Sequence, residues 1–179
     1  MILNSIKDRI EWLKIFNNLP LELRDIYYHP DYVSLNCLDN NSEGCLFYIN
    51  KGSTFWIKPF IKKSIPDLLE KKIKNYFDLE TPYGYGGPIS NTSNLKFIKF
   101  SNSQFLEWAK SENIVAEFIR FHPILNSHKF IDNKFDIIED RITCNIKIED
   151  IDNNLNPFRS KVKNMIRKAM QNTVGKISL

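Results

Sequence analysis

Apolar positions follow two spacings along this chain, one typical of helices and one typical of strands. A spacing of three to four residues predicts amphipathic helices over residues 6–17, 102–112 and 158–170. Ser101 or Ser103 is the expected cap of the second helix. The residues expected to face the core in the first two helices are Ile6, Ile10, Leu13, Phe16 or Asn17, Phe105, Trp108 and Ala109.

Strand patterns occupy the intervening stretches. Residues 45–50 and 54–60 are rich in β-branched and aromatic residues and flank Gly52, which suits the positive φ of a hairpin turn. Residues 114–125 begin with the apolar run Ile-Val-Ala, which is typical of a central strand covered on both faces. We therefore expect one hairpin and one buried central strand.

Other stretches are less regular. Residues 135–138 and 141–148 have the pattern of a second hairpin, and residues 24–35 form an aromatic segment interrupted by Pro30. Residues 65–77 are ambiguous between a helical turn and a connection. Strands and helices mixed in this order predict an α/β or α+β domain with a sheet covered on its faces.

Composition places the chain among folded proteins. Of its 179 residues, 42% are hydrophobic and 26% are charged, which is enough for one domain with a proper core. Cys37, Cys45 and Cys144 are odd in number and form no CxxC pair, so we interpret them as reduced thiols. Charges in the first dozen residues exclude a signal peptide, and we expect a cytoplasmic protein. Contact with a membrane surface stays open.

The net charge of +4 is concentrated near the C-terminal end. Residues 159–168 contain five basic residues and no acidic residue. Such a segment can bind phosphate or an anionic membrane, or it can be a solvated helix face. The five candidates for phosphate binding are Arg159, Lys161, Lys163, Arg167 and Lys168.

The stretch "DLETPYGYGGPIS", residues 78–90, holds three of the six glycines in the chain. Gly84, Gly86 and Gly87 let the backbone approach a ligand closely or adopt positive φ. Tyr83 and Tyr85 alternate, so in an extended strand their rings would share a face and could stack on a sugar or a base, or fill a core. No P-loop motif is present, and the glycines alone are a weak phosphate signal.

Four polar or aromatic residues outside this stretch complete the list of candidates. His29 and Tyr28 are possible substrate contacts, and His29 is alternatively a turn histidine. Arg120 can bind phosphate or carboxylate bidentately, or pair with Glu117 inside the protein. We interpret His122, which precedes Pro123, as a structural histidine with its hydrogen bonds satisfied. We find no Ser-His-Asp or Cys-His arrangement and no metal-ligand spacing, so no catalytic residue is assigned.

Four segments together resemble a known family. "RDIYYHPDYVSL", "DLETPYGYGGPIS", "FLEWAKSENIVAEFIRFHPIL" and "RSKVKNMIRKAMQN" are similar, in order and spacing, to the N-terminal part of the Fem-type acyltransferases. These GNAT-like enzymes include the transferases that build the interpeptide bridges of peptidoglycan. The resemblance extends from about residue 24 to residue 172.

The resemblance implies a fold and an activity. It implies two GNAT-like domains facing each other across a cleft, each with a mixed, largely antiparallel sheet flanked by helices. Residues 1–155 would be the first domain, and residues 156–179 a basic helix that begins a second domain. The enzyme would transfer an aminoacyl or acetyl group, from aminoacyl-tRNA or acyl-CoA and with no tightly bound cofactor, to an amine of a cell-wall or sugar-nucleotide precursor.

The resemblance also places the glycine stretch. A strand over 78–87, a turn over 88–101, a helix and the strand over 114–125 would follow the GNAT order. GNAT pyrophosphate loops carry Arg or Gln before Gly-x-Gly, and here Tyr-Gly-Tyr-Gly-Gly-Pro departs from that pattern. The first domain would then be a substrate wall. Its implied contacts are Tyr28, His29, Tyr83, Gly84, Tyr85, Gly86, Gly87 and Arg120.

Alternative functions stay open. The chain could be a non-catalytic module that binds a sugar or nucleotide through Tyr83 and Tyr85. It could also bind nucleic acid or a membrane surface through its basic final helix. As an incomplete enzyme it would need the second domain or self-association, and its basic residues would face the phosphates of a nucleotide, a lipid or tRNA.

Overall fold

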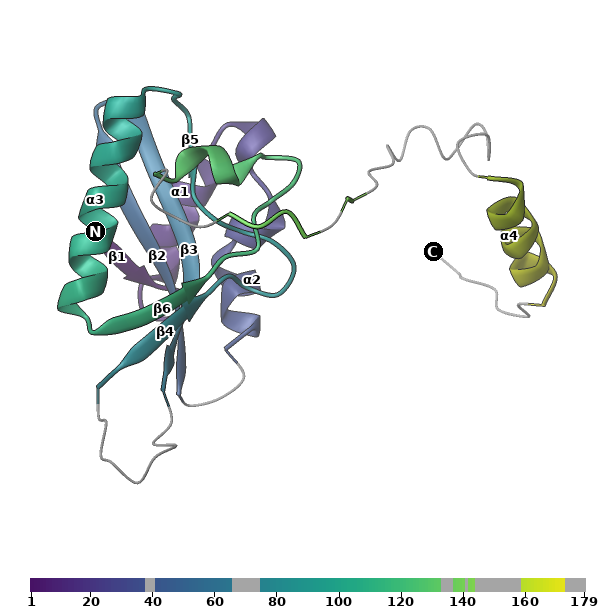
Figure 1. The fold of residues 1–179 in the computed structure, drawn as a ribbon, viewed down its shortest axis with the longest axis horizontal. Coiled ribbons are helices and arrows are strands. Elements are labelled where there is room, and N and C mark those ends of the chain that lie inside the picture. The colour runs from purple at the N-terminus through teal and green to yellow at the C-terminus, as the bar shows by residue number, and fades with distance from the viewer. Residues whose placement is uncertain (38–40, 66–74, 133–136, 141, 144–158, 173–179) are drawn as a thin grey trace. The chain divides into compact units, whose positions relative to one another are not determined.

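A computed structural model describes residues 1–37, 41–65, 75–132, 137–140, 142–143 and 159–172 (Figure 1). The chain divides into two compact units, Met1–Ile138 and Glu139–Leu179. The first unit contains a sheet with its covering helices, and the described part of the second contains helix α4, Ser160–Asn172. No helix in the described ranges is both long enough and apolar enough to cross a membrane.

The described strands of the first unit form one sheet in the order β1-β2-β3-β4-β6, and β5 also pairs with β3. Every pairing is antiparallel except that of β4 with β6, which is parallel. The predicted fold class is confirmed, because this is a mixed, largely antiparallel sheet with flanking helices. The strands are β1 (Ile2–Asn4), β2 (Ser42–Lys51), β3 (Thr54–Ser64), β4 (Phe77–Glu80), β5 (Ile89–Ser90) and β6 (Ile114–Phe118).

The predicted hairpin is the longest pairing in the sheet. Strands β2 and β3 pair from Ser42 with Lys63 to Lys51 with Thr54. Gly52 in the turn has a φ of 65°, as its position between the two strands predicts. Both strands extend beyond their predicted ends, and β3 also pairs with β4 along residues 61–64 and with β5 at Trp56 and Ile57. Strand β3 is therefore the central strand of this unit.

Helices cover the two faces of the sheet separately (Figure 1). Because side chains alternate along a strand, Leu46 and Ile57 enter one core while Phe47 and Trp56 enter the other. The first core lies against α1 (Arg9–Asn17), the short 3₁₀ helix η2 (Ile26–Tyr28) and α2 (Pro30–Leu35). The second core lies against α3 (Leu95–Ser111), which supplies Phe97 and Phe105.

Helix α1 differs from its prediction in its start and in its buried face. Residues 2–4 form strand β1 instead, and the side chain of Asn4 accepts hydrogen bonds from the N–H groups of Ile6 and Lys7. Ile6 and Ile10 are consequently exposed. The helix buries Trp12, whose indole N–H donates to the Tyr28 carbonyl at 3.0 Å. The predicted stripe is therefore wrong at Ile6 and Ile10, whereas Phe16 packs against the first core as expected.

Helix α3 begins well before the predicted serine caps. The side chain of Asn94 accepts hydrogen bonds from the N–H groups of Lys96 and Phe97, so Asn94 is the cap. Ser101 is fully buried inside the helix. Phe105 and Ala109 are buried, as the spacing predicts.

Strand β6 contradicts the prediction of a central strand over 114–125. It ends at Phe118 and stands at the end of the strand order, next to β4 alone among the described strands. Val115 and Phe118 are each more than half exposed. An apolar run is compatible with an edge as well as with a centre, because it carries no information on how many neighbours a strand has.

The remaining predictions have mixed outcomes. Helix α4 is confirmed within two residues at each end of its predicted range. Pro30 starts α2 at its first position, so it begins a helix there. The predicted hairpin over 135–138 and 141–148 lies mostly outside the described residues, as do residues 66–74 of the ambiguous stretch.

Candidate functional site: the tyrosine–glycine loop

The loop over residues 81–88, here called the tyrosine–glycine loop, is anchored at both ends beside the chain that follows β6. Thr81 N–H donates to the Phe118 carbonyl at 3.1 Å, and Gly86 N–H donates to the Arg120 carbonyl at 2.8 Å. His122 N–H in turn donates to the Gly86 carbonyl at 3.0 Å. The residues between these anchors form a bend, so the predicted strand over 78–87 ends at Glu80.

The glycines of the loop are required for steric reasons. Gly84 has a φ of 96°, and a Cβ at this position would overlap the ring of Tyr27. Gly87 has a φ of 87°, and its Cβ would lie 2.9 Å from Ser127 Oγ. A Cβ on Gly86 would lie 2.9 Å from Thr81 Cγ2. Three glycines gather here because the backbone packs directly on other parts of the protein.

Four tyrosines, here called the tyrosine cluster, lie at this loop: Tyr83 and Tyr85 belong to it, and Tyr27 and Tyr32 contact it from outside. The ring of Tyr27 makes edge contacts with Tyr32 at 5.3 Å and with Tyr85 at 5.7 Å between centroids. Burial raises the pKa of Tyr27, and the neighbouring tyrosines and Asp25 raise it further. The rings therefore come from two segments that are far apart in the sequence.

Tyr83 is the member of the cluster that faces solvent. Its side chain is 77% exposed. Its backbone is fixed on both sides, because the Tyr32 hydroxyl donates to its carbonyl at 2.8 Å and its N–H donates to Asn36 Oδ1 at 3.1 Å. The expectation that Tyr83 and Tyr85 share one face of a strand is wrong, since Tyr85 packs against Tyr27 and His122. The loop presents one exposed ring on a fixed backbone.

His122 lies behind the cluster with both ring nitrogens hydrogen-bonded. It is 2% exposed. Leu125 N–H donates to its Nδ1 at 3.2 Å, so Nε2 is the nitrogen that carries the hydrogen and donates to Asp25 at 3.2 Å. These contacts are those of a structural histidine that positions Tyr27 and Tyr85.

Tyr28 and His29 are placed in structural positions. Tyr28 has no exposed surface, and its hydroxyl donates to the Gly87 carbonyl at 3.2 Å. Burial raises its pKa, with a smaller contribution from Asp25. His29 caps α2, because its Nδ1 accepts a hydrogen bond from Asp31 N–H. Tyr28 therefore stabilises the loop through its hydrogen bond to Gly87, and His29 stabilises the start of α2.

Arg120 is exposed beside the loop. Its N–H donates to Thr81 Oγ1 at 3.1 Å, and its guanidinium lies 5.2 Å from the ring of Phe118. Glu117, its alternative partner, instead pairs with Lys58 at 2.6 Å. The charge of Arg120 thus stands in solvent near the tyrosine–glycine loop.

The ion pair between Lys58 and Glu117 was not predicted from the sequence. The Lys58 ammonium is almost fully buried and lies 3.8 Å from the centre of the Phe105 ring. Burial lowers the pKa of Lys58, and Glu117 opposes that shift. The signal for it was a lysine inside the apolar strand "FWIKPF". Glu117 also lines a groove of about 220 Å³ formed by residues of β3, β4 and β6, namely Lys63, Asp78, Leu79, Glu80, Ala116, Glu117 and Phe118.

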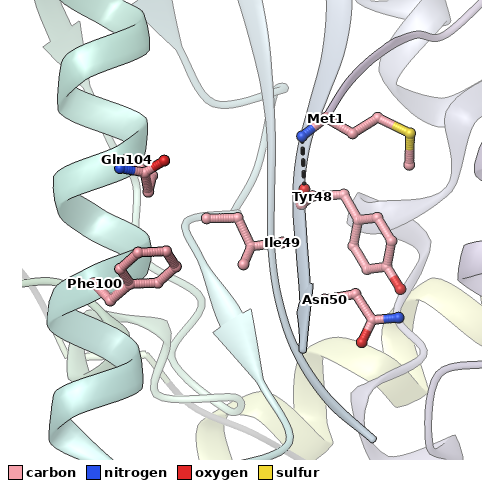
Figure 2. A pocket seen from close by; sticks show the side chains of 6 residues that line it. All are labelled: Met1, Tyr48, Ile49, Asn50, Phe100 and Gln104. Atoms are coloured by element: carbon pink, nitrogen blue, oxygen red, sulfur yellow. Dashed lines mark hydrogen bonds between the residues drawn. The ribbon is translucent and has the colours of Figure 1, made fainter. Parts of the chain in front are cut away.

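A wider hollow of about 420 Å³ lies between β2 and α3 (Figure 2). The ammonium of Met1 donates to the Tyr48 carbonyl at 3.0 Å on one side of it. Its other lining residues are Ile49, Asn50, Phe100 and Gln104. None of the residues expected to bind substrate lines this hollow.

The remaining candidates lie elsewhere. Arg159 and the lysines and arginine of α4 belong to the second unit, and four of the five basic residues are exposed, with Lys163 half-buried. Within the described ranges, no group of three or more His, Cys, Asp or Glu could hold a metal ion. Cys45 is buried, which raises its pKa to about 12, and Cys144 lies outside the described residues.

This chain matches no protein-family model, no curated protein and no solved structure.

Proposed function

We propose that residues 1–138 form the substrate wall of a Fem-type, GNAT-like acyltransferase, and that the tyrosine–glycine loop borders the acceptor cleft. The observation that carries the proposal is the order of elements around the loop. Strand β4, the loop, the two-residue strand β5, helix α3 and strand β6 follow one another, and β6 returns parallel beside β4. This order of strand, turn, helix and strand is the one that the resemblance implies.

The chemistry of acyl transfer to an amine agrees with the residues that the loop exposes. Direct transfer needs a bound acceptor and a positioned carbonyl, without an enzyme nucleophile. Tyr83 offers an aromatic face for a sugar ring, and Arg120 offers a guanidinium for phosphate or carboxylate. These two groups suit an acceptor that combines a sugar with an anionic group, such as a sugar-nucleotide precursor of the cell wall.

The donor is expected to bind outside this unit. Helix α3 begins at Leu95, seven residues after Pro88, so the glycine N–H groups do not form its N-terminus. A pyrophosphate loop of the GNAT kind needs that continuity. We therefore assign acyl-CoA or aminoacyl-tRNA to a second domain.

The second candidate function is a non-catalytic sugar- or nucleotide-binding module. The fixed backbone of Tyr83 favours it, because a preorganised aromatic side chain binds without a catalytic group nearby. Binding without turnover by the complete natural protein would select this candidate.

The test is binding of UDP-N-acetylglucosamine and of a muramyl-peptide precursor to the full chain, measured by calorimetry. We expect Tyr83→Ala to weaken binding about tenfold, the loss of one stacking contact. Tyr76→Ala is the matched control, because Tyr76 is a tyrosine 44% exposed outside the loop. Equal affinity of both variants, or no binding by the parent chain, would contradict an acceptor site at the loop.

A separate measurement distinguishes the enzyme from the module. An antibody against this chain would report the mass of the native protein in its source cell. A species about twice the 21.1 kDa of this chain is expected if a second domain of similar size completes the enzyme. A species of 21.1 kDa that binds sugar would favour the module.

A further inference from the structure

The apolar side chains of helix α4 lie along one stripe. Val162, Met165 and Ile166 recur at spacings of three and four, as on a helix with one apolar face. Met165 is 62% exposed and Val162 is 38% exposed, while Ile166 is half-buried. An exposed apolar stripe costs free energy unless an apolar partner covers it.

Basic residues border this stripe on both sides. Lys161 and Lys168 are seven residues apart and follow one border, while Lys163 and Arg167 are four apart and follow the other. Residues 159–172 contain no Asp or Glu, so none of these charges is neutralised within the helix. The polar face between the two basic borders carries Asn164.

The start of α4 is unfavourable for an isolated helix. Its first turn contains no acidic residue, and Arg159 and Lys161 stand at the positive end of the helix dipole. The carbonyl of Arg159 accepts hydrogen bonds from Val162 and Lys163 N–H, so Arg159 is held at this end. An anion supplied by a binding partner would compensate these charges.

We propose that α4 binds the surface of an anionic lipid bilayer and lies in the plane of the interface. Val162, Met165 and Ile166 would enter the boundary of the acyl chains. The basic residues on both borders would contact lipid phosphates. This inference does not depend on the proposed acyltransferase function, because it concerns the second unit alone.

The arrangement of charged and apolar side chains on α4 favours an anionic bilayer over nucleic acid as the partner. Nucleic acid would neutralise the basic residues but leave the apolar stripe in water. A bilayer interface covers both kinds of side chain at once, which is the pattern of interfacial helices. The 13 residues of α4 reach about 20 Å, too short for the ~30 Å hydrocarbon core, so the helix lies on the membrane.

The first test is flotation of the full chain with vesicles of phosphatidylcholine, with and without about one third phosphatidylglycerol. We expect flotation with the anionic vesicles alone, and a loss of binding as salt rises. Lys163→Gln with Arg167→Gln should weaken binding about 25-fold, since each charge contributes about fivefold. The matched control is Lys99→Gln with Lys110→Gln, which removes two exposed charges from α3.

The second test locates the stripe. A tryptophan introduced by Met165→Trp should emit at shorter wavelength when anionic vesicles are added, while one introduced by Asn164→Trp on the polar face should not. Spectra are taken as differences from the parent chain, whose own tryptophans lie in the first unit.

Three outcomes would overturn the proposal. The first is an equal loss of binding in the α3 control. The second is short-wavelength emission from Met165→Trp before vesicles are added, which would show that protein covers the stripe. The third is binding of tRNA without flotation on anionic vesicles.

Discussion

The tyrosine–glycine loop and helix α4 are both rich in residue types that bind ligands, yet the protein uses them in opposite ways. Most residues of the loop make contacts within the protein. Gly84 packs on Tyr27, Tyr85 packs on His122, and the Gly87 carbonyl accepts a hydrogen bond from Tyr28. Tyr83 is the exception, because its side chain is exposed. In α4, nearly all the basic side chains stand in solvent.

This difference teaches how a composition signal should be weighed. A cluster of unusual residues indicates a binding site to the extent that its side chains remain unused by the protein itself. By that measure, the loop offers Tyr83 and the neighbouring Arg120, whereas α4 offers a whole face. Most substitutions in the loop should therefore lower the stability of the fold. Substitutions on the exposed face of α4 should instead weaken binding and leave stability nearly unchanged.

The largest effect on stability is expected for Gly84→Ala. The substitution combines a left-handed backbone with overlap on the Tyr27 ring, so it should lower the free energy of unfolding by about 3 kcal/mol. Gly52→Ala is the control, because Gly52 also has positive φ but has nothing within 4 Å of its Cβ position. It should cost about 1 kcal/mol in urea denaturation. Equal costs would show that packing on Tyr27 is unimportant.

A smaller effect with a pH signature is expected for Tyr28→Phe. Loss of the hydroxyl leaves the Gly87 carbonyl without its donor, which should cost about 1–2 kcal/mol at pH 7. The folded-state pKa of Tyr28 lies above its ordinary value of 10.0, so the stability linked to it is complete below pH 10 and is lost as pH rises further. Between pH 7 and 11, the melting temperature of Tyr28→Phe should therefore fall less steeply than that of the parent chain. An equal fall in both proteins would show that other ionisable groups cause the loss of stability at high pH.

Tyr83→Ala should change stability by less than about 0.5 kcal/mol, because the exposed ring contributes little to packing. The hydrogen bonds of Tyr83 with Tyr32 and Asn36 use its backbone and remain possible. The measurement is urea denaturation of the variant beside the parent. A loss above 1 kcal/mol would mean that the ring packs on the protein, and it would weaken the assignment of Tyr83 as a ligand contact.

The smallest effect is expected for Lys161→Gln with Lys168→Gln. Both side chains are exposed in the second unit, so unfolding of the first unit should not change measurably. Tryptophan fluorescence reports that transition, because Trp12, Trp56 and Trp108 all belong to the first unit. A shifted midpoint would show that α4 stabilises the first unit.

Local signals in the sequence predicted the elements that depend on local interactions. The β2–β3 hairpin follows from alternation around Gly52, and α4 follows from its apolar spacing. The start of α1 and the place of β6 could not be predicted in this way. Residues 2–4 leave the helix because β2 is available as a partner, and β6 is an edge because no described strand lies beyond it.

The sequence drew attention to the tyrosine–glycine loop, but it did not predict the internal structure of the loop. The glycines mark a place where backbone must pack closely, but the ring on which Gly84 packs lies 57 residues earlier, at Tyr27. Tyr28 and His29 attract attention by residue type alone, and both are used within the fold. Lys58 could not be identified as buried without knowing that Glu117 reaches it.

The Lys58–Glu117 pair has a consequence for how the chain assembles. Strands β2 and β3 meet through a two-residue turn, so their pairing is local and should form early. Lys58 is then directed toward the core beneath α3, and its partner arrives 59 residues later on β6. A nascent chain that stops short of residue 117 would leave this ammonium uncompensated in an apolar interior. We therefore expect the first unit to complete its folding late in synthesis, after β6 has left the ribosome.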